Sequence, residues 1–411
     1  MALEFSEVAT LGCMFFSKKQ LDDAVKNIEN LKAFTLKVRD VVNNNSKVKF
    51  GTGKSAFINA MNPNDSKVLD DMVRGCSAAI AIKSWLQKYH NEKSDIIIKK
   101  GYMTGNVWPS PVNKFKISAF GMKDYNSSDI ILYTGKSSGY DYYYGVSLKK
   151  KSSVYHPDPT LINKAFDSVM EGKNFDKLKD DIGKLRRKWF ADRVRKADKK
   201  KLIKIEREHL KLPDSKLILA KPAGTKKPYP NIKGTLQEGY EDGNGFRKWM
   251  NREVGQGDLY TQMLKLVKPH TELFANSLVN LVLKSKLNDE LNANKDLNDY
   301  YFGFALVTGI GYVRRNNVPD MGPGKVYPQE SVLCAINHLA NSKKKYTMKQ
   351  VPNPAGDESD AAKVFFIISK GKVSILNLQV RYKGSFTAQP QFQASLTKEF
   401  KEILKGACLD I

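Results

Sequence analysis

The sequence predicts an α/β protein, in which a mixed β-sheet flanked by helices precedes a further helical segment and an α+β C-terminal region. Two observations support this. Hydrophobic residues first recur at helical spacing, and the pattern then changes to short β-rich runs separated by Gly, Pro, Asn and Ser. The 411 residues suffice for one large or two ordinary domains with hydrophobic cores. We expect three parts, 1–171, 172–240 and 241–411.

The first part begins with two predicted helical segments. Residues 18–48 are expected to be mostly helical, because apolar side chains recur at helical spacing at Leu21, Val25, Ile28 and Leu31. A second helix is expected over residues 66–90, with Asn64, Asp65 or Ser66 as its N-cap.

Four β-rich runs then predict a meander of strands. They cover residues 95–103, 113–122, 128–135 and 141–150. A helix is expected to follow at 158–171, because Asp158 can cap it and Pro159 suits its first turn.

The rest of the chain begins with a basic zone over residues 172–227 that reads as a helix and a linker. Two helices and three strand-like runs follow, at residues 245–267, 271–287, 299–313, 363–370 and 372–384. The C-terminal region is either a separate domain or a set of strands that completes the first sheet. In the second case, residues 172–290 are a helical insertion.

The net charge of +25, from 68 Lys and Arg against 43 Asp and Glu, favours a polyanionic partner. Nucleic acid is the default partner, because each phosphate that is neutralised releases counterions. The alternative is an ordinary basic protein from a Lys- and Asn-rich proteome. We predict double-stranded DNA as the partner and no membrane association; a homo-oligomer is compatible with the sequence.

Two basic regions are candidates for contact with phosphates. Arg186, Arg187 and Lys188 precede Trp189 in the basic zone, although a solvated helix face would explain the same run. Asn377, Gln379, Arg381 and Lys383 would share one face of the strand at 372–384, which is either a DNA-binding face or the solvent side of a half-buried strand.

Several classes of protein are disfavoured by what the sequence lacks. Its four cysteines have no CxxC spacing and its five histidines form no HExxH motif, which argues against a zinc site and a disulfide framework. Glu4 and Glu7 disfavour an N-terminal signal peptide, and no apolar run approaches the length of a membrane span. We therefore expect a soluble, cytoplasmic protein.

The segment GTGKS at residues 51–55 resembles half of a phosphate-binding loop. A complete loop needs a glycine four spacers before Gly53, where the chain has Val48. The helix that follows would also be short, because it must end before Pro63. An NTPase that uses Lys54 is therefore the weakest of the function classes considered.

The stretch from residue 127 to residue 151 carries the strongest chemical signal. Asp129 begins one apolar run, and Ser147 and Lys149 project from one face near the end of the next. Antiparallel pairing would place Asp129 beside Ser147 and Lys149. A carboxylate there could hold Mg²⁺, and an ammonium could stabilise charge on a phosphate. Alternatively, the lysines protect a sheet edge and Asp129 caps a turn.

This pattern resembles the PD-(D/E)XK nuclease superfamily, in which an acid at a strand start is followed by a turn and acid-x-Lys on the next strand. The resemblance covers about residues 66–171, and it implies a restriction-endonuclease-like core with Mg²⁺ or Mn²⁺ as cofactor. Ser128 stands in the place of the family's proline. Ser147 stands in the place of the second acid and puts one metal-binding charge in doubt.

Four residues are candidates for the missing acid. They are Asp141 on the same strand face, Asp124 before the first strand, and Asp70 or Asp71 on the preceding helix. Helix acids can serve this way in the superfamily, so we predict that Asp71 joins Asp129 at the metal.

We therefore predict a metal-dependent DNA endonuclease, and the composition suits a phage or bacterial protein. Asp129, Ser147 and Lys149 would form the catalytic site, and Lys150 and Lys151 would contact DNA. The competing class is a non-catalytic nucleic-acid-binding or virion-associated protein that retains a nuclease-like fold.

Overall fold

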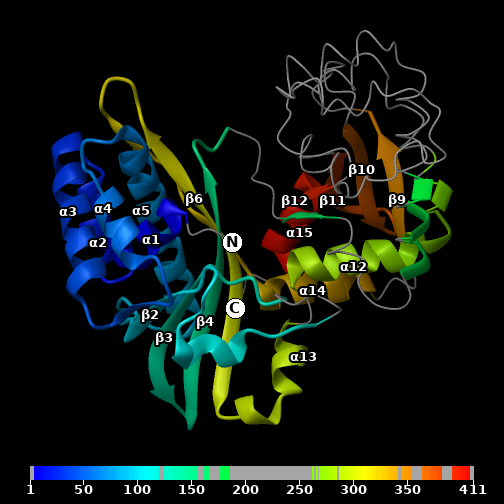
Figure 1. Cartoon of the computed structure of the whole chain (residues 1–411), viewed down its shortest axis with the longest axis horizontal. Helices are drawn as coiled ribbons and strands as arrows, with labels where there is room; N and C mark the ends of the chain where they lie inside the picture. The colour runs from blue at the N-terminus through cyan, green and yellow to red at the C-terminus, as the bar shows by residue number, and fades with distance from the viewer. Residues whose placement is uncertain are drawn as a thin grey trace, which may run out of the picture.

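The structure is a computed structural model of the 411-residue chain. It describes residues 4–119, 125–155, 162–165, 176–178, 180–182, 184–185, 262, 265–266, 268–284, 287–340, 345–352, 363–381 and 391–407. These residues form two β-sheets, each with its own helices (Figure 1). The prediction of an α/β protein with a mixed sheet flanked by helices, followed by an α+β C-terminal region, is confirmed.

The first sheet has seven strands in the order β1-β2-β3-β4-β6-β7, with β8 also paired to β6. Its strands are β1 (Val48–Phe50), β2 (Lys100–Met103), β3 (Ile130–Ser137), β4 (Tyr140–Lys151), β6 (Tyr300–Val313), β7 (Pro319–Met321) and β8 (Lys325–Pro328). β4 is central: it pairs antiparallel with β3 and parallel with β6, which comes about 150 residues later in the chain. The two halves of the sequence therefore build one sheet.

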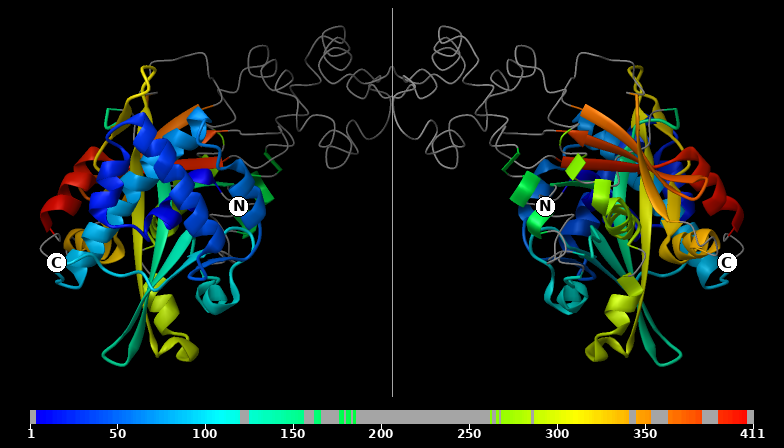
Figure 2. Two further views of the ribbon diagram at one scale, coloured as in Figure 1. Left: turned by 90° about the vertical axis from the view of Figure 1, so that its left-hand side faces the viewer. Right: turned by 90° about the vertical axis from the view of Figure 1, so that its right-hand side faces the viewer.

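Helices cover one face of this sheet, as both views in Figure 2 show. They are α1 (Phe5–Cys13), α2 (Lys18–Ala24), α3 (Ile28–Asn44), α4 (Lys54–Ala60) and α5 (Ser66–Tyr89). On β4, Tyr144, Val146 and Leu148 are buried in the hydrophobic core beneath these helices. Because strand side chains alternate, Ser147 and Lys149 project from the opposite face.

The opposite face of the sheet is covered by η1 (Ser110–Phe115) and the segment of α13 (Leu287–Asn292) and η4 (Lys295–Leu297). Phe115 packs against Tyr143 and Phe302, with ring centroids 4.9 and 4.8 Å away. The prediction of a strand at 113–122 is therefore wrong at 113–115, which belong to η1, and only Ala119 among its described residues forms a β-bridge.

The second sheet is antiparallel and has the order β5-β12-β11-β10-β9. Its strands are β5 (Ile162–Ala165), β12 (Gln391–Leu396), β11 (Val373–Arg381), β10 (Lys363–Lys370) and β9 (Tyr346–Val351). The helical elements of this half are η3 (Lys268–His270), α12 (Thr271–Leu283), α14 (Gln329–Ala340) and α15 (Lys398–Ala407). The predicted helix at 158–171 is wrong at 162–165, because this segment pairs with β12 across more than 220 residues of chain.

The cysteines divide into two kinds. Cys13 of α1 and Cys76 of α5 are buried and reduced, and their Sγ atoms lie 3.9 Å apart in the core between the two helices. Cys334 of α14 is disulfide-bonded. The sequence argued against a disulfide framework, and this one bonded cysteine departs from that expectation.

Candidate functional site

The β3–β4 hairpin determines the position of Asp129. Ile130 pairs with Val146, so Asp129 lies opposite Ser147, and its amide donates to the Val146 carbonyl at 2.8 Å. The Asp129 carboxylate oxygen Oδ2 accepts from the Leu148 amide at 2.6 Å and from the Ser147 hydroxyl at 3.3 Å. The structure thus brings Asp129 and Ser147 into direct contact, with Ser147 as a donor that orients the carboxylate.

The segment before Asp129 is held by its own hydrogen bonds. Asn126 donates to the Phe115 carbonyl at 2.9 Å and accepts from the Ser128 hydroxyl at 2.6 Å. Thr104 donates to the Asp129 carbonyl at 2.9 Å. This network fixes the backbone that carries the carboxylate.

Gly145 allows this segment to cross close to β4. A Cβ atom at Gly145 would lie 2.2 Å from Ser128 Oγ and 2.6 Å from the Phe302 ring. Since real Cβ atoms do not approach other atoms so closely, a larger residue would push the segment away from the strand. The glycine before Val146-Ser147-Leu148-Lys149 is therefore part of the geometry that places Asp129.

Lys149 is half-buried near the end of β4, two residues beyond Ser147. Its ammonium is close enough to Asp129 and to Glu7 to lower the pKa of both carboxyl groups. Asp129, Ser147 and Lys149 therefore lie in one region of the molecule, at the end of β4.

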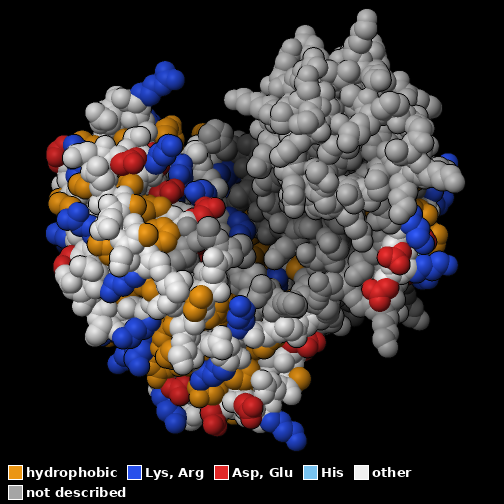
Figure 3. Space-filling model, viewed as in Figure 1, with side chains coloured by type: hydrophobic (Ala, Val, Ile, Leu, Met, Phe, Trp, Pro, Cys, Tyr) orange, Lys and Arg blue, Asp and Glu red, His pale blue; other side chains and the backbone are white. Residues whose placement is uncertain are grey.

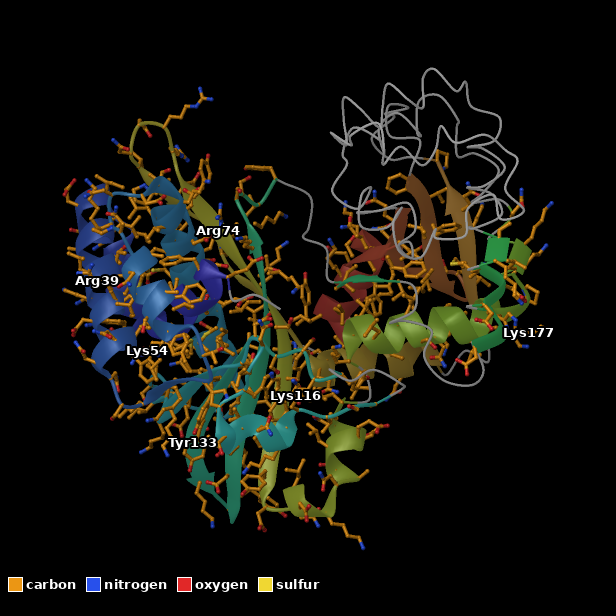
Figure 4. All side chains as sticks on the ribbon, viewed as in Figure 1. Arg39, Lys54, Arg74, Lys116, Tyr133 and Lys177 are labelled. Atoms are coloured by element: carbon orange, nitrogen blue, oxygen red, sulfur yellow. The ribbon has the colours of Figure 1, made fainter. Side chains whose placement is uncertain are left out.

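Glu7, in the first turn of α1, was not among the residues predicted from the sequence. Its Oε2 accepts from the Glu4 amide at 3.0 Å. Glu7 and Asp129 line the same cavity of about 150 Å³, together with Thr104, Asn106, Trp108, Lys116, Asn126 and Ser128. Lys116 belongs to the segment that follows η1, and Figure 4 shows it near β4 and β6. We call this space the Asp129 cavity.

The two carboxyl groups of the Asp129 cavity are both perturbed. Burial raises the pKa of Asp129, against the opposing effects of the Lys149 ammonium and of the hydrogen bonds from Leu148 and Ser147. Burial, and then the nearby Asp129 charge, raise the pKa of Glu7 to about 8. Two acids in one buried site favour a proton or a cation between them.

The sequence-predicted partner acids lie elsewhere. Asp71 accepts from Arg74 at 2.7 Å and lies 3.9 Å from Lys150, which also pairs with Glu4 at 2.9 Å. Asp71 is on α5, under the face of β4 opposite to Ser147 and Lys149. The carboxylate that lines the cavity with Asp129 is Glu7; Asp71 is not among the lining residues, and its role at a metal ion stays a prediction.

The other candidate acids do not reach the cavity or cannot be placed. Asp70 accepts from the Val313 amide at 2.7 Å at the far end of β6. Asp141 accepts from Tyr133 at 2.7 Å and lies six residues before Ser147, roughly 20 Å along an extended strand. Asp124 lies outside the described residues.

The predicted DNA-contacting residues are scattered in the structure. Lys150 is exposed and ion-paired, whereas Lys151 is buried. Arg381 ends β11 in the second sheet, opposite Gln391 of β12. Arg186, Arg187, Lys188 and Lys383 lie outside the described residues. Figure 3 shows Lys and Arg side chains spread over the described part of one face, among acidic and hydrophobic ones.

The GTGKS segment does not form a phosphate-binding loop in the structure. Lys54 Nζ donates to the Asn43 carbonyl at 2.6 Å (its place on α4 is labelled in Figure 4). The helix α4 is short and ends at Ala60, as Pro63 predicts. Lys54 therefore tethers α4 to the end of α3.

Glu7 could have been noticed from the sequence by one signal. It is one of only two acids in the first 21 residues, and it stands three residues after Glu4 at the start of an apolar run, which is a helix N-terminus signature. Those two acids were interpreted only as evidence against a signal peptide.

Comparisons with protein-family models, with curated proteins and with solved structures find no match to this chain. Within the described residues, no cluster of three or more His, Cys, Asp or Glu side chains is arranged to hold a metal ion. No helix among those residues is long and apolar enough to cross a membrane. The functional argument therefore depends on the geometry of the Asp129 cavity itself.

Proposed function

We propose that this chain is a metal-dependent DNA endonuclease that hydrolyses phosphodiester bonds at the Asp129 cavity. The observation that supports the proposal is the convergence of the buried Asp129 carboxylate and the half-buried Glu7 carboxylate with the Lys149 ammonium at the end of β4. Carboxylates and a lysine at one polar cavity suit phosphoryl chemistry, because negative charge develops on phosphate oxygens in the transition state.

The residues of the cavity fit Mg²⁺ or Mn²⁺. Mg²⁺ is commonly bound through one or two carboxylates and keeps several waters. Asp129 and Glu7 would supply the carboxylates, and a cavity of about 150 Å³ has room for a hydrated ion. When bound there, the metal would lower the pKa of a coordinated water and stabilise charge on the scissile phosphate.

The protein's own groups have separate tasks in this proposal. Ser147 and the Leu148 amide orient the Asp129 carboxylate through their two hydrogen bonds. Lys149 would hold the attacking water or neutralise charge on the phosphate. Lys116, which lines the same cavity, would contact the phosphate backbone.

The identity of the substrate is supported by charge. The net charge of +25 favours a polyanion, and counterion release makes association with double-stranded DNA favourable. The Asp129 cavity is lined by polar and charged groups that suit phosphate oxygens, so the proposed recognition at this point is of the sugar-phosphate backbone.

Plasmid cleavage with Mg²⁺ or Mn²⁺ tests the proposal. We expect Asp129→Asn and Lys149→Ala each to slow cleavage by about 100-fold or more, as for removal of a charge-stabilising group. Matched controls lie in the same hairpin but away from the cavity: Asp141→Asn and Lys136→Ala should cleave like the wild type. Cleavage that survives both site substitutions would refute the assignment.

A non-catalytic nucleic-acid-binding protein is the second candidate. It is favoured by Ser147, because the position that would hold a second strand carboxylate has a hydroxyl group that bonds to Asp129. Gel-shift binding to plasmid fragments, without cutting in either Mg²⁺ or Mn²⁺, would support this candidate over the nuclease.

A further inference from the structure

A second, larger cavity of about 450 Å³ lies on the helical side of the first sheet. It is enclosed by one face of α5, the segment between β7 and β8, and the start of α14, and it shares no lining residue with the Asp129 cavity. Its walls are mainly apolar and include Ile80, Trp85, Val326 and Pro328. We call it the Glu330 cavity, after the carboxylate in its lining.

The wall opposite α5 is fixed by close contacts. The Ser77 hydroxyl donates to the Gly322 carbonyl at 2.8 Å and accepts from the Ile310 amide at 3.0 Å, which ties the segment after β7 to α5. A Cβ at Gly324 would lie 2.5 Å from the Ser77 carbonyl oxygen and 2.8 Å from Ala81 Cβ. The backbone thus lies directly on the helix, so the cavity is preformed.

One end of the cavity is polar. Tyr301 donates to Glu330 Oε1 at 3.2 Å, and the hydroxyl of Tyr89 donates in turn to that of Tyr301. The other carboxylate oxygen, Glu330 Oε2, is buried and has no hydrogen-bond partner among the residues that the structure describes. Burial also raises the pKa of Glu330. One lysine, Lys88 of α5, lines the same cavity.

We propose that the Glu330 cavity is a binding site for a small cationic aromatic molecule, with an ammonium or amidinium group at Glu330 and a ring against Trp85. A cavity of 300–1,000 Å³ with apolar walls and a few convergent polar groups is typical of small-molecule sites. A positive group would pair with the unsatisfied carboxylate oxygen, and an aromatic body would fit walls that include Trp85 and Tyr89. An anionic ligand would instead be repelled by Glu330.

This inference is independent of the proposed nuclease, because none of its residues belongs to the Asp129 cavity. It is tested by isothermal titration calorimetry of the full chain with tryptamine as the cationic probe. Indole-3-propionic acid, which has a similar ring and chain but a negative group, is the matched control ligand. We expect saturable binding of tryptamine and none of indole-3-propionic acid.

Two variants locate the site. Glu330→Gln keeps the shape of the side chain and removes its charge, so tryptamine should bind at least tenfold more weakly. The control is Glu29→Gln, at an exposed position of α3, which should bind tryptamine like the wild type. Ser84 is exposed and lines the cavity, so Ser84→Trp should obstruct it without a change in the core. No saturable tryptamine binding to the wild type, or binding unchanged in both Glu330→Gln and Ser84→Trp, overturns the proposal.

Discussion

The two cavities place buried carboxylates in different surroundings. In the Asp129 cavity, burial raises the pKa of both carboxyl groups, the Asp129 charge raises that of Glu7 further, and the Lys149 ammonium acts against both shifts. In the Glu330 cavity, a single carboxylate is surrounded by tyrosine hydroxyls and apolar walls. We propose that the first arrangement holds a divalent ion and that the second holds one organic cation. The two cavities differ in the number of carboxylates and in the polarity of their walls, and this difference is why we assign different ligands to them.

The comparison is tested most strongly at Glu7. If Glu7 is the acid that joins Asp129, Glu7→Gln should reduce plasmid cleavage by about 100-fold, since it removes half of the carboxylate pair. Asp71→Asn should reduce it by less than about tenfold, because Asp71 is paired with Arg74 and Lys150. Initial rates of supercoiled-plasmid nicking measure both.

The opposite ranking of these two variants would restore Asp71 as the second acid. A circular dichroism melt of each variant serves as the control for folding, since Asp71 also anchors Arg74. Glu330→Gln should leave the nicking rate unchanged, because its cavity shares no residue with the Asp129 cavity.

A second prediction concerns the backbone that supports the Asp129 cavity. Gly145→Ala would place a Cβ 2.2 Å from Ser128 Oγ and 2.6 Å from the buried Phe302 ring. Overpacking of this kind costs about 2 kcal/mol, so urea unfolding should show a lower midpoint with an unchanged slope. Gly139→Ala is the contrasting variant, because no heavy atom lies within 4 Å of its added Cβ. That position has φ +88°, so only backbone strain should contribute there.

If Gly145→Ala keeps full stability and full cleavage, the segment of Asn126 and Ser128 does not hold Asp129 in place. If stability falls but cleavage by the folded fraction is normal, the segment has only a structural role.

The elements that could be predicted from the sequence are those determined by residues close to one another in the chain. The hairpin was predictable because strand alternation and one tight turn are enough to set Asp129 opposite Ser147. Helix α5 was predictable from its periodicity and its cap, and the structure selects Asp65, whose side chain accepts from the Lys67 amide. The short helix after GTGKS followed from Pro63 for the same reason.

The parts that were missed depend on contacts between distant segments. Helix α1 is buried from Val8 to Cys13 and so lacks the polar stripe that marks an amphipathic helix. Its Glu7 reaches Asp129 across 122 residues of chain. β5 exists because β12 pairs with it, which no local pattern at 162–165 reveals. Asp71 was predicted and Glu7 was not considered, because a sequence cannot show which acid on the helices of one sheet face reaches the end of β4.

A third prediction distinguishes the two cavities by how the stability of the protein depends on pH and on Mg²⁺. Both Glu7 and Glu330 have a pKa raised by burial, so the folded state binds more protons than the unfolded state above the ordinary carboxyl pKa. Stability should therefore be highest at low pH within this window and fall as the pH rises from about 4.5 towards 8. For Glu7, whose pKa rises from 4.5 to about 8, this loss is at most about 5 kcal/mol, and Glu330 should lose stability in the same direction.

Of the stability that is lost as the pH rises, added Mg²⁺ should restore only the share that comes from the Asp129 cavity. Urea unfolding at pH 8 in EDTA and in Mg²⁺, at matched ionic strength, measures this difference. We expect Mg²⁺ to stabilise the wild type and Glu330→Gln, and to have no effect on Glu7→Gln or Asp129→Asn. Equal stabilisation of all four proteins would mean that the ion acts elsewhere on the chain.

The smallest effect is expected within the polar end of the Glu330 cavity. Tyr301→Phe removes the donor to Oε1 of the half-buried Glu330, whose Oε2 already has no partner among the described residues. Loss of such a bond costs about 1 kcal/mol. Tyr89→Phe removes only the outer hydroxyl of the chain and should cost less, because Tyr301 still donates to Glu330. Unfolding free energies at pH 8 give both values. With a saturating cationic ligand present, the cost of Tyr301→Phe should shrink, since the ligand supplies the missing donor; an unchanged cost would place the ligand away from Glu330.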